Sequence, residues 1–321
     1  MSKEPSFNEI DILKLFRSNK ANSSFLNGIG DDAAVIKIKN QKLAVSCDSQ
    51  INNVHFKLEF STISQIAFRA VSVALSDLAA MGANPLFFTN SLHIPKGFSK
   101  KEISLIKKGF IAAEKRFNVQ LIGGNVASSK VFAIDVTVIG SLNNYISRGS
   151  HKDEKIYVSG NIGSANAGLN LLKMKKMDKE LVQKYRAPIP RVELAKKLSS
   201  KGFLSSMIDI TDGLAIDLER LIKFKRKSLG AQIIWSRIPK SLNLEKYFSK
   251  KKIFEMVLFG GDDYELLFTV KKDKQRYFEN YVKNNNLNVF EIGTTNPTGD
   301  IFIHKNGKNI KIKNGGYVHK F

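Results

Sequence analysis

The sequence has 321 residues and is short of cysteine, of long apolar runs and of acidic side chains. Its one cysteine, Cys47, excludes an internal disulfide framework and a cysteine-rich metal site. The longest apolar stretches, residues 67–75 and 131–140, contain polar or charged side chains and fall short of the ~20 residues that cross a bilayer. The N-terminal segment lacks the apolar core and small-residue cleavage site of a signal peptide. We therefore expect a globular, cytoplasmic protein without a membrane span.

Three common catalytic motifs are also missing. No GxxxxGK[ST] segment occurs, which excludes a P-loop, and no GxSxG segment occurs, which argues against a serine hydrolase of the nucleophile-elbow type. The five histidines are scattered without the HxxxH spacing of a zinc site. His55 is therefore expected to be an ordinary surface or core histidine unless its neighbours line a site.

Positive charge is abundant, with 51 lysine and arginine residues against 29 acidic ones and a net charge of +22. A basic field attracts polyanions, so nucleic-acid binding is one interpretation. The lysines, however, are spread along most of the chain without one compact stripe. We take a solvated basic surface as the main interpretation and do not expect nucleic acid as a partner.

Hydrophobic periodicity predicts a mixed first half. Residues 41–46 and 130–142 are expected to be strands, because apolar and polar positions alternate in the second of them. A helix is expected from Thr62, which can form a capping box with Gln65, to about residue 82. A second helix is expected over residues 99–117, where apolar side chains recur on one face.

Beyond a polar, loop-like stretch at residues 148–154, helical and strand patterns alternate. This alternation is typical of an α/β or α+β unit. We therefore predict two domains, residues 1–147 and residues 148–321.

The scarce acidic residues recur in short segments where glycine, small residues or the end of an apolar strand frames them. These segments are GIGDDAAV with Asp31 and Asp32, AVSCDS with Asp48, SVALSDLAAMGA with Asp77, IDITDGLAID with Asp209, Asp212 and Asp217, and FGGDDYELL with Asp262, Asp263 and Glu265. Such placement suggests functional carboxylates.

Asp77 is the most informative, because a carboxylate deep in an apolar helix is costly without a partner. Its partner is either a cation or, structurally, an arginine such as Arg69. Asp48 ends a strand and can project into a cleft, although an Asx-turn would also explain it. Asp31 and Asp32 are adjacent like charges that Mg²⁺ would stabilise, with a solvated turn as the alternative.

Asp209 and Asp212 stand at the predicted entry of a helix. They can converge on one ion while free backbone amides bind a phosphate, or Thr211 or Asp212 can simply cap the helix. The segment LIGGN resembles a glycine turn in which Gly123 and Gly124 let amides approach an anion.

In this order the segments resemble the thiamine-monophosphate kinases, a family of the aminoimidazole-ribonucleotide synthetase superfamily. The resemblance covers nearly the whole chain and rests on GIGDDAAV, SDLAAMGANP, LIGGN, the Arg148 loop, the PIPR turn, DITDGL, GGDDYELLF and GGYVHKF. It implies a homodimer with an N-terminal dimerising mixed-sheet domain and a C-terminal α/β domain. It also implies ATP-dependent phosphorylation of thiamine monophosphate to thiamine diphosphate, assisted by several Mg²⁺ ions.

The resemblance further implies roles for individual residues. Asp32, Ser46, Cys47, Asp48, Asp77, Asn125, Asp209 and Asp212 match metal-binding positions, Gly124, Arg148 and Thr211 match ATP-contacting positions, and His55, Asp262 and Asn314 match substrate-contacting positions. No catalytic nucleophile is implied, because phosphoryl transfer depends on positioning and charge stabilisation.

Three positions depart from the family pattern. Asn125 stands where an aspartate is usual, Asp262 where a glutamate is usual, and Asn314 where an aromatic residue often stacks on the substrate. These departures leave two alternatives. One is another superfamily member, although the reactive cysteines typical of selenophosphate synthetase and of the hydrogenase-maturation dehydratase are absent. The other is a weakened relative that binds a nucleotide or nucleic acid.

Overall fold

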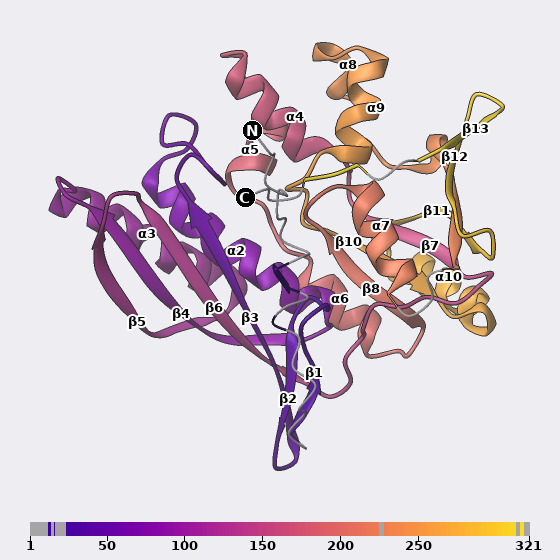
Figure 1. Cartoon of the computed structure of the whole chain (residues 1–321), viewed down its shortest axis with the longest axis horizontal. Coiled ribbons are helices and arrows are strands. Elements are labelled where there is room, and N and C mark those ends of the chain that lie inside the picture. Colours follow the sequence, from indigo (N-terminus) through magenta and orange to yellow (C-terminus); the bar gives the residue numbers. More distant parts are fainter. Residues whose placement is uncertain (1–11, 14–15, 17–23, 225–227, 313–314, 318–321) are drawn as a thin grey trace, which may run out of the picture.

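The computed structural model describes residues 12–13, 16, 24–224, 228–312 and 315–317. Two mixed sheets lie side by side, each covered by helices (Figure 1). The predicted α/β class with two sheet-containing halves is confirmed.

The first sheet has six strands in the order β1-β2-β3-β6-β4-β5. Its strands are β1 (Phe25–Asn27), β2 (Ala34–Ile38), β3 (Gln41–Ile51), β4 (Asn84–Pro95), β5 (Gln120–Ser129) and β6 (Ala133–Leu142). All neighbouring strands are antiparallel except β4 and β5, which are parallel and joined by helix α3 (Lys100–Phe117). Helices α2 and α3 pack together and contribute to one apolar core with β3, β4 and β6.

Helix α2 (Ile63–Ala80) begins as predicted. Thr62 and Gln65 form the reciprocal capping box, and the helix ends at Ala80 with Met81 as its C-cap, before Gly82, whose φ of +74° suits glycine. By length and composition α2 could span a membrane, but 72% of that window is buried inside the protein. It is therefore a core helix, and it packs not only on β3 and β6 but also on α6 and β8 of the other half.

The second sheet has seven strands in the order β13-β12-β9-β11-β7-β10-β8, with β9 and β12 parallel. Its strands are β7 (Lys155–Ser159), β8 (Leu204–Ile210), β9 (Gly230–Ile234), β10 (Glu265–Val270), β11 (Val289–Asn296), β12 (Ile301–Lys305) and β13 (Lys308–Lys311). The α-helices of this half are α4 (Ser164–Lys173), α5 (Lys179–Arg186), α6 (Val192–Ser199), α7 (Leu214–Lys223), α8 (Leu244–Tyr247), α9 (Lys250–Phe259) and α10 (Gln275–Asn284). Short 3₁₀ turns lie at Trp235–Arg237 and Lys272–Lys274.

Two local expectations were wrong. The segment LIGGN is not a turn but part of β5, where Gly124 pairs with Asn90 of β4. A side chain at Gly124 would lie 2.4 Å from the Asn90 carbonyl oxygen, so this glycine serves the close approach of two backbones. Helix α7 is capped by neither Thr211 nor Asp212, because its N-cap is Gly213.

Candidate functional site

Three aspartates from distant parts of the chain converge where the two halves meet. Asp32 precedes β2, Asp77 lies on α2 and Asp209 lies on β8, and each offers a carboxylate oxygen within 4.8 Å of the others. Among the described residues, no other group of three or more His, Cys, Asp or Glu side chains gathers in this way. The geometry thus joins three of the predicted metal ligands.

Asp209 is the most deeply buried of the three, with 2% of its surface exposed. Its Oδ2 is buried and has no hydrogen-bond partner in the described part of the chain. Burial, reinforced by the charge of Asp32, raises the pKa of Asp209 well above its ordinary value. An orphaned carboxylate oxygen facing two further carboxylates fits a hard divalent cation, which prefers oxygen ligands.

In the described part of the chain, the side chain of Asp77 is hydrogen-bonded to Ser46 of β3, whose hydroxyl donates to Asp77 Oδ2 at 2.5 Å. Burial raises the pKa of Asp77 well above its usual range, and the charges of Asp209 and Asp48 add to the shift. The structural ion pair with Arg69 is not formed, since Arg69 pairs with Asp262 instead. A cation is left as the stronger explanation for a carboxylate at this place.

The side chains of the adjacent acids Asp31 and Asp32 make different contacts. Asp31 Oδ2 accepts hydrogen bonds from Asn27 Nδ2 at 2.6 Å and from Ser147 Oγ at 2.5 Å, so it anchors the loop. Asp32 faces the cluster, where the Arg148 guanidinium donates to its Oδ1 at 2.6 Å and also to the Gly30 carbonyl oxygen at 3.1 Å. Despite this arginine, burial keeps the pKa of Asp32 above its ordinary value.

A cavity of about 690 Å³ opens beside the cluster between the two halves. Asp48, Asp77, Thr211 and Asp212 line it together with the predicted substrate residues His55 and Asp262. Burial raises the pKa of Asp48 to about 6, although Arg69 and a backbone hydrogen bond from Ser49 oppose the shift. Four of the five acidic segments therefore line one cavity, and the fifth, GIGDDAAV, contributes Asp32 to the adjoining cluster.

Aromatic and basic side chains complete the walls. The cavity is also lined by Phe56, Phe60, Tyr185, Phe259, Tyr264, Tyr317, Lys57 and Lys173. This composition suits a ligand that has an aromatic part and a phosphate.

The turn after β8 is held by an acid to which the sequence pattern assigned no role. Asp217 Oδ2 accepts hydrogen bonds from the backbone amides of Thr211, Asp212 and Gly213 at 3.0, 3.0 and 3.1 Å. The prediction that these amides are free for a phosphate was therefore wrong. Arg220 bridges Asp217 and Asp212, so the turn presents Asp212 toward the cavity in a fixed position.

Cys47 lies between Ser46 and Asp48 on β3 and is exposed. Side chains alternate along a strand, so its thiol points to the sheet face opposite the one from which Ser46 reaches Asp77. Cys47 nevertheless lines the cavity, and its main-chain oxygen is the candidate ligand there. His55 Nδ1 accepts a hydrogen bond from the Ile51 backbone amide at 3.1 Å, which fixes its ring at the cavity wall.

Two predicted positions lie apart from the cluster. Gly124 and Asn125 are on edge strand β5. Across the sheet, Gly124 pairs with Asn90 of β4, Asn90 pairs with Val136 of β6, and Val136 pairs with Asp48 of β3. Three strand spacings put the β5 pair about 14 Å from Asp48, so neither residue lines the cavity. Asn314 lies outside the described residues.

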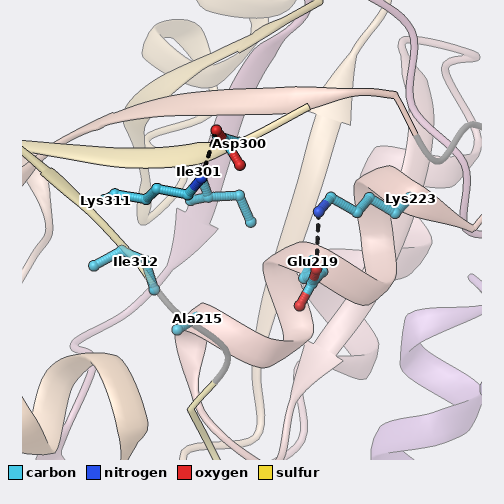
Figure 2. Close-up of a pocket in the computed structure, with 7 residues that line it drawn as sticks. All are labelled: Ala215, Glu219, Lys223, Asp300, Ile301, Lys311 and Ile312. Atoms are coloured by element: carbon cyan, nitrogen blue, oxygen red, sulfur yellow. Dashed lines mark hydrogen bonds and ion pairs between the residues drawn. The ribbon is translucent and has the colours of Figure 1, made fainter. Parts of the chain in front are cut away.

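A second cavity of about 240 Å³ lies between α7 and the β12–β13 hairpin (Figure 2). Its charged lining residues are paired, Lys223 with Glu219 and Lys311 with Asp300, around an apolar floor that includes Ile301. It contains none of the predicted site residues. The larger cavity is accordingly the candidate site.

Comparison with known proteins gives a consistent result. Residues 30–142 match the family of the AIR synthase related protein, N-terminal domain. The thiamine-monophosphate kinase of Buchnera aphidicola subsp. Schizaphis graminum is 34% identical over 98% of this chain and 99% of the relative. The thiamine-monophosphate kinase of Aquifex aeolicus is 29% identical over 98% of this chain and 97% of the relative.

Solved structures agree with these sequence matches. The structure of AaThiL complexed with AMPPCP and TMP superposes with a TM-score of 0.82 at 27% identity, covering 97% of each chain. The hydrogenase maturation protein HypE superposes with a TM-score of 0.71 at 16% identity, which shows a shared fold only.

Proposed function

Since the chain belongs to the thiamine-monophosphate kinase family, we propose that it transfers the γ-phosphoryl group of ATP to thiamine monophosphate, giving thiamine diphosphate and ADP. The observation that carries the proposal is the convergence of Asp32, Asp77 and Asp209 beside a cavity large enough for small-molecule substrates.

Magnesium is the cofactor to which the cluster is best suited. Asp32, Asp77 and Asp209 would hold it, with Asp48 and Asp212 at the cavity wall as further ligands. Bound Mg²⁺ would supply positive charge that offsets the repulsion between two phosphate-bearing substrates. Ser46 orients the Asp77 carboxylate through its hydrogen bond, and we assign its hydroxyl oxygen as a further ligand of the ion.

Thr211 at the cavity wall and Arg148 beside Asp32 are assigned to ATP, and His55 and Asp262 at the cavity wall are assigned to thiamine monophosphate. Gly124 matches an ATP-contacting position of the family, but it lies on β5 outside the cavity, so no contact in this cavity is assigned to it. Because the acceptor phosphate is already anionic near pH 7, the reaction requires no protein nucleophile and no strong base. The cavity lies at the junction of the proposed domains, residues 1–147 and 148–321.

A homodimer is proposed from the free edge of the first sheet. Strand β5 is an edge strand, and it exposes Ile122 by 52% and Val126 by 69%. A second copy covering this edge would bury those side chains and enclose Asn125. The change Val126→Glu should lower the mass measured by sedimentation toward that of a monomer. Leu242→Glu, at an 87% exposed position on the other half, should leave the mass unchanged.

The decisive assay incubates the protein with Mg²⁺, ATP and thiamine monophosphate and measures thiamine diphosphate. Asp77→Asn should abolish product formation with the fold preserved, whereas Asp273→Asn, at an exposed position, should not change it. Absence of product from the unaltered protein while ATP still binds would favour a nucleotide-binding relative over a kinase. We propose a cytoplasmic location, because the relatives of this chain are thiamine-monophosphate kinases, which are biosynthetic enzymes.

A further inference from the structure

Arg69 is a buried arginine that the metal-centred reaction scheme does not use. It projects from α2, two helical turns before Asp77, and only 2% of its surface is exposed. Its guanidinium donates three hydrogen bonds, from Nε to Gln50 Oε1 at 3.0 Å, to the Tyr185 carbonyl oxygen at 2.5 Å and to Asp262 Oδ1 at 2.6 Å. One side chain thereby links β3, α5 and the loop before β10.

Asp262 is held by these contacts in one orientation. Its Oδ1 accepts hydrogen bonds from Arg69 and from the Tyr264 hydroxyl, the latter at 3.1 Å. Within the described part of the chain, its Oδ2 has no partner, and the residue lines the larger cavity. The arginine thus takes one oxygen of the carboxylate and leaves the other for a ligand.

The loop that carries Asp262 needs such support because its backbone is unusual. Asp262 and Tyr264 have φ values of +75° and +50°, a region that side-chain-bearing residues rarely occupy. Backbone hydrogen bonds to Thr211 and Ile210 tie the loop to β8. The ring of Tyr264 lies 5.7 Å from the Arg69 guanidinium, so the same arginine also packs against the loop.

Helix α2 brings the two ends of the site into one rigid element. Arg69 and Asp77 are eight residues apart, which corresponds to about 12 Å along the helix axis. One end of the helix therefore serves the aspartate cluster, and the other end reaches the loop at the far wall of the cavity.

On this geometry we infer that Arg69 is a positioning residue for thiamine monophosphate, acting through Asp262. It aims one carboxylate oxygen at the substrate and sets the distance between substrate and metal cluster. The inference rests on the proposed function and deepens it. Its consequence is specific: loss of Arg69 weakens the binding of thiamine monophosphate, and leaves the binding of ATP unchanged.

The test compares Arg69→Met, Asp262→Ala and the double variant. KM for thiamine monophosphate should rise at least tenfold in Arg69→Met, with KM for ATP within twofold of the unaltered protein. KM for thiamine monophosphate in Arg69→Lys should lie between those of the unaltered protein and Arg69→Met, because lysine keeps the charge but cannot form all three hydrogen bonds of the guanidinium. The double variant should match Asp262→Ala alone, since the arginine acts through that carboxylate.

Arg191→Met is the matched control, because Arg191 forms a comparable ion pair with Glu265 and neither residue lines the cavity. It should lower the melting temperature and keep KM for thiamine monophosphate within twofold. If Arg69→Met does not fold, Arg69→Lys with Asp262→Ala carries the comparison.

Titration calorimetry with thiamine monophosphate alone gives a readout apart from turnover. A weaker Kd in Arg69→Met supports the inference even if the unaltered protein forms no thiamine diphosphate, an outcome that overturns only the kinase function. The role of Arg69 would be overturned if Arg69→Met lost as much affinity for ATP as for thiamine monophosphate. It would also be overturned if the effects of Arg69→Met and Asp262→Ala on KM for thiamine monophosphate multiplied in the double variant.

Discussion

Replacing Asp209 by asparagine should stabilise the metal-free protein and destroy its activity. The change keeps the size of the side chain and removes a charge that lies within 4.8 Å of the carboxylates of Asp32 and Asp77. It also places an amide donor beside their oxygens, at a position where Asp209 Oδ2 has no partner among the described residues. Both effects favour the folded state when no cation is present.

The expected gain in the free energy of unfolding follows from the distance between the carboxylates of the cluster. Two full charges 4.8 Å apart repel by about 3.5 kcal/mol at an effective dielectric constant of about 20. Arg148 already offsets part of the charge of Asp32, and the upward pKa shifts of Asp209 and Asp77 act in the same direction, by favouring their neutral forms. We therefore expect a gain of about 2 kcal/mol, or roughly 3 °C in melting temperature for a chain of this length.

The assay is thermal unfolding of the unaltered protein and the variant, in EDTA and in excess Mg²⁺, together with product formation. The unaltered protein should gain more from Mg²⁺ than Asp209→Asn does, because ligand binding stabilises only the form that binds. Asp178→Asn is the control, since asparagine caps a helix as well as aspartate does and Asp178 caps α5 away from the cavity. A lower melting temperature of Asp209→Asn in EDTA would refute the repulsion argument, and retained activity would refute the metal assignment.

Three further outcomes are expected. The pKa of Asp48 rises from 3.8 to about 6 on folding, so its contribution to the free energy of unfolding is most favourable below pH 4 and is lost as the pH rises through 6. The loss is at most about 3 kcal/mol. In unfolding measured without metal, Asp48→Asn should flatten this part of the pH profile. Gly261→Ala should cost about 1–3 kcal/mol and raise KM for thiamine monophosphate, because the new methyl group would lie 2.3 Å from the Thr211 carbonyl oxygen; an unchanged denaturation midpoint would contradict this. Asn125→Asp should leave the Mg²⁺ concentration that gives half-maximal activity unchanged in a magnesium titration, because Asn125 lies on β5 outside the cavity; a lower concentration would show that this position takes part in metal binding after all.

Local rules were sufficient where short-range contacts decide the structure. The capping boxes at Thr62 and Ser99 start α2 and α3, and both helices lie within two residues of their predicted bounds. The acids of the site were also recognisable from the sequence, because a buried carboxylate in an apolar helix, as at Asp77, has few alternatives to a charged partner.

Other features depend on backbone contacts that are distant in the sequence. Gly124 looks like part of a turn until β4 is placed beside it, where Asn90 leaves no room for a side chain. The amides at residues 211–213 look free until Asp217 is seen to occupy them. In both cases a partner outside the local segment satisfies the backbone, and no local pattern specifies which partner that is.

The sequence by itself determined which acids stand in segments where a carboxylate needs a partner, since helix propensity and apolar neighbours can be read from the chain, but it left the kind of partner open. Only the tertiary structure decided how those carboxylates are arranged. In the folded chain Arg69 forms its ion pair with Asp262 and not with Asp77, and Asp209 lies beside Asp77 near the end of α2. Asn125 lies on β5, away from this cluster. The physical reason is that ion pairing and metal coordination depend on distances of a few ångströms, which long-range packing sets.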